Sequence, residues 1–165
     1  MNRSDFPLVL IGIAGNIEGA TRLQKYGFLC NMRINDLKKI NFYYNWIASH
    51  YGPFSPELAN DLERSEKDGL IQKFKVTNEY GYQVERFALH DTTVVDKFMN
   101  EHSTEYKKIK EIVSFYQQRT LSDLLQDVYY QYPEFTTVSE IKAQIGKKIY
   151  ESDSYLSTQY DYPDL

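Results

Sequence analysis

The clearest hydrophobic pattern in this chain lies between residues 51 and 90. Ser55 suits a helix N-cap, Pro56 suits the first helical position, and Gly69 suits the left-handed residue that ends a helix. We therefore expect a helix over 55–68. Its inner stripe consists of Leu58, Ala59 and Leu62.

Two runs with the composition of β-strands follow this helix. Residues 70–77 and 82–90 are rich in Val, Phe, Tyr and Ile, and the turn Asn78-Glu79-Tyr80-Gly81 separates them. A helix followed by a two-stranded hairpin is the pattern of a recognition helix and wing. The sequence therefore predicts a winged helix-turn-helix.

The rest of the chain is predicted to be mainly helical. The second helix should place Leu23, Tyr26, Gly27 and Cys30 on its inner face, whereas Arg22 and Lys25 should point outward. The apolar spacing and the capping residues predict helices over 5–16, 20–32, 93–100, 104–119 and 120–131, and a last helix from 137 to about 149.

Together these elements predict an α+β fold, a winged helix-turn-helix with a C-terminal helical extension. The expected parts are a winged-helix domain over 1–92, a helical extension over 93–150 and a flexible acidic tail over 151–165. No run reaches the roughly 20 apolar residues of a membrane helix. The single cysteine, Cys30, allows no intrachain disulfide, so we expect a cytoplasmic protein with this thiol in the core.

The net charge of −4 is concentrated at the C-terminus. Residues 151–165 contain four acidic residues and no basic ones. The body of the chain, residues 1–150, therefore has 19 acidic and 19 basic residues. A neutral body has no broad electrostatic footprint for DNA, so any nucleic-acid surface must be local.

Signs of reaction chemistry are missing from the sequence. His50, His90 and His102 are far apart and form no H-x-x-x-H pair, and there is neither a phosphate-binding loop nor a G-x-S-x-G motif. We therefore expect no metal, no cofactor and no enzymatic activity.

The predicted recognition helix carries a narrow polar ridge on its outer side. Helical projection places Asn60, Arg64 and Lys67 there, and these residue types read base edges. The alternative is a solvated face with i,i+4 ion pairs such as Glu63–Lys67. In the wing, the candidates for phosphate contact are Lys73, Lys75 and Arg86.

Three short blocks resemble a known family. The blocks Ala20-Thr21-Arg22-Leu23-Gln24-Lys25-Tyr26-Gly27-Phe28-Leu29, Tyr51-Gly52-Pro53-Phe54-Ser55-Pro56-Glu57-Leu58 with Gly69-Leu70-Ile71, and Val128-Tyr129-Tyr130-Gln131-Tyr132-Pro133-Glu134 resemble the YwgA-like proteins of bacteria and archaea. A more distant likeness is to Panacea-type antitoxin domains, which share the L-Q-K helix and the Tyr-Gly-Pro turn. The resemblance implies a winged-helix-like domain and a role in regulation or antitoxin-like protein binding.

The leading functional prediction is a DNA-binding transcriptional regulator that contacts double-stranded DNA. We expect it to form a homodimer through the C-terminal helices. The competing prediction is a protein-interaction module of antitoxin or adaptor type, in which the wing and a tyrosine-rich surface bind a protein partner without DNA binding.

Overall fold

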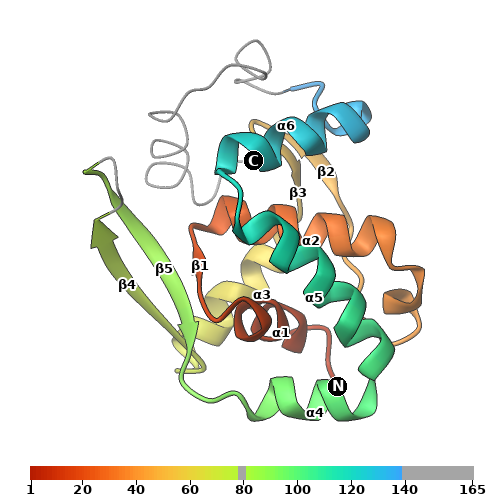
Figure 1. Cartoon of the computed structure of the whole chain (residues 1–165), viewed down its shortest axis with the longest axis vertical. Helices are drawn as coiled ribbons and strands as arrows, with labels where there is room; N and C mark the ends of the chain where they lie inside the picture. The colour runs from red at the N-terminus through yellow and green to blue at the C-terminus, as the bar shows by residue number, and fades with distance from the viewer. Residues whose placement is uncertain (78–80, 139–165) are drawn as a thin grey trace.

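The computed structural model of the chain has a mixed α+β fold, which confirms the predicted class (Figure 1). It describes residues 1–77 and 81–138; the helix expected from 137 to 149 and the acidic tail lie almost entirely outside this range. The helices are α1 (Asp5–Ala14), α2 (Ala20–Arg33), α3 (Pro56–Lys67), α4 (Thr93–Glu101), α5 (Ser103–Gln117) and α6 (Leu121–Gln131), with short 3₁₀ turns η1 (Asn35–Lys38) and η2 (Pro133–Phe135). The strands are β1 (Ile17–Glu18), β2 (Ile47–Ser49), β3 (Gly52–Phe54), β4 (Ile71–Thr77) and β5 (Gln83–Leu89).

The elements around α3 form as the sequence predicts. The Ser55 hydroxyl accepts a hydrogen bond from the Leu58 N–H at 3.2 Å and so caps the helix. Gly69 has a φ of 74°, the left-handed conformation that ends a helix. The strands β4 and β5 follow directly, so the predicted helix and hairpin are confirmed.

The larger sheet has three antiparallel strands in the order β1-β5-β4. Ile17 pairs with Phe87 on β5, and Lys73 of β4 pairs with the same residue on its other side. The β4–β5 hairpin extends beyond the helices along one side of the molecule (Figure 1). A separate two-stranded sheet, β2–β3, lies between α2 and α3 in the chain.

Helix α2 lies in the middle of the molecule and is buried on more than one face (Figure 1). It contacts α1, α5, α6 and β3. The prediction that Lys25 points outward is therefore wrong: this residue is 2% exposed. The β3 segment covers the side of α2 that was expected to face solvent, and the Lys25 Nζ donates to the Pro53 carbonyl there at 3.0 Å.

One hydrophobic core joins the N-terminal and C-terminal parts of the described chain. Phe6 of α1 packs against Phe42, which in turn stacks on Phe98 of α4 with ring centroids 5.2 Å apart. Cys30 lies in this core, and burial raises the pKa of its thiol to about 12. The thiol is therefore a packed core group and not a nucleophile at neutral pH.

Candidate nucleic-acid interface

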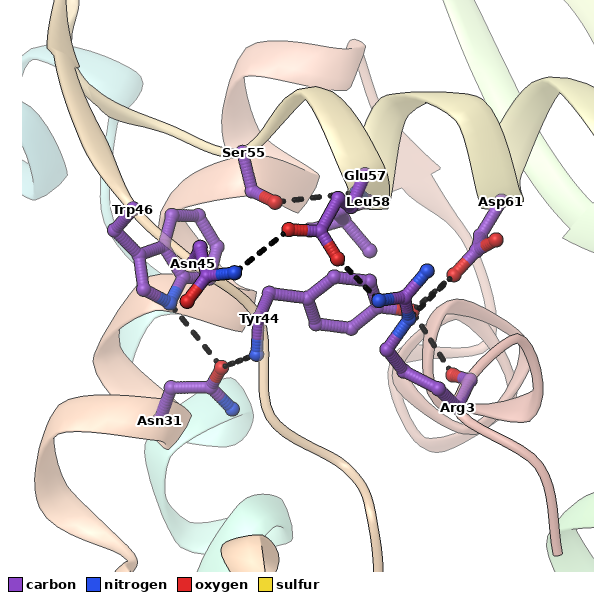
Figure 2. Close-up of polar contacts among 9 residues, drawn as sticks. All are labelled: Arg3, Asn31, Tyr44, Asn45, Trp46, Ser55, Glu57, Leu58 and Asp61. Carbon is purple, nitrogen blue, oxygen red and sulfur yellow. Dashed lines mark hydrogen bonds and ion pairs between the residues drawn. The ribbon is translucent and has the colours of Figure 1, made fainter.

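A polar network anchors the first two turns of α3 to the N-terminus of the chain (Figure 2). Arg3 forms an ion pair with Glu57, and its Nε donates to Asp61 Oδ2 at 3.2 Å. The Tyr44 hydroxyl lies 2.8 Å from the same carboxylate oxygen. Burial is the largest cause that raises the pKa of the Tyr44 phenol, and this hydrogen bond is a smaller one, so the phenol keeps its proton.

The same network continues into the segment that precedes β2. Asn31 Oδ1 accepts hydrogen bonds from the Tyr44 backbone N–H at 2.9 Å and from the Trp46 indole at 3.2 Å (Figure 2). The Asn45 side chain donates to Glu57 at 3.0 Å. The N-terminal turn of α3 is therefore covered by Arg3 and Asn45, although this is the end that enters the groove in helix-turn-helix proteins.

The turn that begins α3 is held by two neighbouring residues of α2. The Gln24 side chain hydrogen bonds both the N–H and the carbonyl of Ser55, and Lys25 donates to the Pro53 carbonyl. No carboxylate accompanies Lys25 in these contacts, and burial lowers its pKa to about 7. The first two of the three blocks that carry the family resemblance are thus in direct contact.

The outer ridge of α3 is exposed as projection predicts. Asn60, Arg64 and Lys67 are all exposed, whereas Leu58, Leu62 and Ser65 are buried. Lys67 also forms the predicted alternative interaction, an ion pair with Glu63 at 2.9 Å. Within residues 1–77 and 81–138, Arg64 is the ridge cation that forms no ion pair.

The three wing cations do not form one surface. Lys73 and Lys75 alternate along β4 and share a face, but Arg86 pairs with Phe74 and so lies on the opposite face. Lys73 is 3.1 Å from Glu85 and 3.8 Å from Glu66. Arg86 forms an ion pair with Glu18 of β1.

Sequence reasoning missed the role of Asp61, because it considered polar candidates only on the outer ridge of this helix. Asp61 is 3% exposed and lies on the inner side of α3. A signal was present, because Leu58, Asp61, Leu62 and Ser65 follow the i, i+3, i+4, i+7 spacing of a buried face. Its partner Arg3 is 58 residues away, and no local pattern points to it.

The charge of this region is balanced toward acid. Residues 55–89 contain seven acidic and five basic residues.

Across residues 1–77 and 81–138, no group of three His, Cys, Asp or Glu side chains is arranged to hold a metal ion. In the same part of the chain, none of the helices combines the length and the apolar character needed to cross a membrane.

A scan against protein-family models, a search of curated proteins and a search of solved structures each return no match to this chain. The likeness to YwgA-like proteins therefore stays a prediction that depends on the three short blocks.

Proposed function

We propose that this chain is a regulatory module of winged-helix type that binds a protein partner through the surface of α3, β4 and β5. The observation that carries this proposal is that three of the five cations of this region are paired with acids. Lys67 forms an ion pair with Glu63, and Arg86 forms one with Glu18. Lys73 forms ion pairs with both Glu66 and Glu85.

The order of elements supports the winged-helix part of the proposal. Helix α1, strand β1, helices α2 and α3, and strands β4 and β5 follow one another as in a winged helix, and β1 lies beside β5 in the sheet. The departure is the stretch 34–55 between α2 and α3, which holds η1 and the β2–β3 hairpin. A helix-turn-helix has a turn of about three or four residues at this point.

Electrostatics favour a protein partner over DNA. Phosphate contacts provide most of the non-specific affinity for DNA, through the release of counterions by Lys and Arg. Each exposed ion pair here is worth no more than about 1 kcal/mol, so a phosphate could displace the acid. The displaced carboxylate would nevertheless remain beside the phosphate and repel it. Alternating acids and bases suit a protein surface of complementary charge.

Exposed apolar side chains flank the same surface. Leu70, between α3 and β4, is 48% exposed, and Tyr82, just before β5, is 43% exposed. Apolar contact residues surrounded by a polar rim are typical of protein–protein interfaces.

A specific observation also favours a second candidate, the DNA-binding transcriptional regulator. Asn60, Arg64 and Lys67 form an exposed row of base-reading residue types along α3. In that case Lys75 on β4 would contribute a phosphate contact, because it is exposed and shares a strand face with Lys73, which lies near Glu66 of α3.

A salt titration of the full chain with random duplex DNA separates the two candidates. We expect weak binding with a shallow slope of log K against log salt, because few net cations meet the phosphates. The double variant Glu66→Gln and Glu85→Gln should bind DNA more tightly than the unchanged chain, since it removes the acids around Lys73. Asp96→Gln on α4 is the matched control and should leave DNA binding unchanged.

A steep slope for the unchanged chain, lost on Arg64→Glu, would instead establish the DNA-binding candidate. For the protein-binding candidate, a pulldown from the source organism should recover a partner with the unchanged chain. The variant Arg64→Glu with Leu70→Asp should lose that partner while keeping the unfolding curve of the unchanged chain. Retention of the partner by this variant would place the interface elsewhere.

A further inference from the structure

A polar pocket lies on a different part of the molecule, between β1, α2 and the end of α5. It has a volume of about 230 Å³ and is lined by Asn16, Ile17, Glu18, Arg22, Tyr26 and Gln117. This volume is far above the roughly 10–15 Å³ that one water needs and below the roughly 300 Å³ of pockets for drug-sized ligands. Its size fits a small metabolite.

Arg22 contributes the cationic side of the pocket. Its Nη1 lies 3.2 Å from the Arg119 carbonyl, 3.3 Å from the Tyr116 carbonyl and 3.5 Å from the Tyr26 hydroxyl. These contacts fix the guanidinium at the C-terminal end of α5. Within residues 1–77 and 81–138, Nε and Nη2 donate to no acceptor. That pair of donors has the geometry that binds a carboxylate through two parallel hydrogen bonds.

Glu18 contributes the anionic side. Its Oε1 accepts from Arg86, which places the carboxylate at the edge of the sheet, and its other oxygen is left to accept a further donor. Tyr26 and Gln117 add neutral polar groups; burial raises the pKa of Tyr26, so its hydroxyl keeps its proton. A ligand that satisfies both charged side chains needs a carboxylate and a cationic amine.

We propose that this pocket binds a free α-amino acid or a zwitterion of similar size. The carboxylate pairs with Nε and Nη2 of Arg22, and the ammonium group pairs with Glu18. The ligand would connect α2 and the end of α5 to β1, which pairs with β5 of the larger sheet. This inference does not depend on whether the partner of the α3 surface is a protein or DNA.

The test is calorimetric titration of the full chain with glycine, L-alanine and L-glutamine. The N-acetyl derivative and the methyl ester of the amino acid that binds are the matched controls, because each lacks one of the two charges. We expect binding of at least one amino acid and at least about tenfold weaker binding of both derivatives.

Two variants locate the site. Arg22→Lys keeps the charge but loses the fork of donors, and Asn16→Trp fills the mouth of the pocket from an exposed position. Both should weaken binding at least about tenfold, whereas Lys97→Arg, at an exposed position on α4 outside the pocket lining, should leave affinity unchanged. Thermal unfolding of each variant shows that it is folded.

Three results would overturn the proposal. The first is that none of the three amino acids, up to high millimolar concentration, gives a heat of binding or shifts a backbone amide signal in NMR spectra. The second is binding that Asn16→Trp leaves unchanged, which would place the ligand elsewhere. The third is equal binding of the N-acetyl derivative, which would exclude a zwitterion as the ligand class.

Discussion

The Gln24 side-chain amide forms two hydrogen bonds with the backbone of a single residue, Ser55. Its Nε2 donates to the Ser55 carbonyl at 3.0 Å, and its Oε1 accepts from the Ser55 N–H at 2.9 Å. Ser55 is also the N-cap of α3, so this contact fixes the point where the helix begins relative to α2. The orientation of the proposed interaction surface therefore depends on a residue buried inside the molecule.

Replacing Gln24 with Leu should destabilise the fold by about 1–3 kcal/mol. The Ser55 N–H loses its acceptor in a buried position, whereas the Ser55 carbonyl keeps the Ala59 N–H at 3.1 Å. Urea unfolding at neutral pH measures the change. Gln72→Leu, at an exposed position on β4, is the control and should change stability by less than about 0.5 kcal/mol. Equal effects of the two substitutions would contradict the role assigned to Gln24.

Lys25 should make stability depend on pH in the alkaline range. Burial lowers its pKa from 10.5 to about 7 in the folded chain. Between these values the unfolded chain holds a proton that the folded chain lacks, so stability rises with pH, by up to about 1.4 kcal/mol per pH unit. Below about pH 7 both states are protonated and this dependence disappears.

The measurement is urea unfolding of the unchanged chain and of Lys25→Met between pH 6 and pH 10, the range that brackets the lowered pKa of about 7. The stability of the unchanged chain minus that of Lys25→Met should be flat below about pH 7 and should increase above it. The difference cancels the titration of all other groups. A constant difference across the whole range would show that Lys25 titrates normally and is solvated.

Sequence patterns predicted the parts of the fold that local rules determine. The start and the end of α3 follow from the chemistry of three residues, Ser55, Pro56 and Gly69. The alternation of side chains in β4 and β5 follows from the pleat of a strand alone. The exposure of the Asn60–Lys67 ridge followed from helical projection alone.

Contacts between distant segments were not predictable in the same way. The burial of Lys25 depends on β2 and β3, which are three residues long each and show no alternation of apolar and polar positions. A lysine buried against a backbone carbonyl leaves no charge partner in the sequence. The pairing of Lys73 with Glu66 and Glu85 depends on how α3 lies against the hairpin. The exposure of Asn60 and Arg64 could be predicted from the periodicity of one helix. The pairing of the wing cation Lys73 with acids could be seen only in the tertiary structure.

Gly52 should be more sensitive to substitution than Gly69, although both have a positive φ, 87° and 74°. A Cβ on Gly52 would lie 2.7 Å from Cε1 of Tyr129, whereas a Cβ on Gly69 would meet nothing within 4 Å. Gly69→Ala should therefore cost roughly 1–2 kcal/mol, from the left-handed backbone alone. Gly52→Ala should cost about 1–3 kcal/mol more, from the steric contact.

Thermal or urea unfolding of the two glycine variants gives both costs under the same conditions. Adding Tyr129→Ala to Gly52→Ala should recover part of the steric term, so the two substitutions should be less than additive. Equal costs at Gly52 and Gly69 would mean that β3 moves away from α6 to make room.

Asp61 and Tyr44 should be strongly coupled in a double-mutant cycle. Asp61 Oδ2 is buried 2.8 Å from the Tyr44 hydroxyl, and removing either partner leaves the other polar group without this bond. The cycle built from Asp61→Ala and Tyr44→Phe should give a coupling of about 0.5–3 kcal/mol in urea unfolding.

A matched pair on the same helix is Glu63 and Lys67, whose charged atoms are 2.9 Å apart with side chains that are 58% and 73% exposed. The cycle on this pair should give only about 0.3–0.5 kcal/mol, because solvent screens exposed i,i+4 ion pairs. The contrast separates the side of α3 that anchors the helix from the side that it offers to a partner. A coupling at Asp61 and Tyr44 no larger than at the exposed pair would show that this buried network does not hold α3 in place.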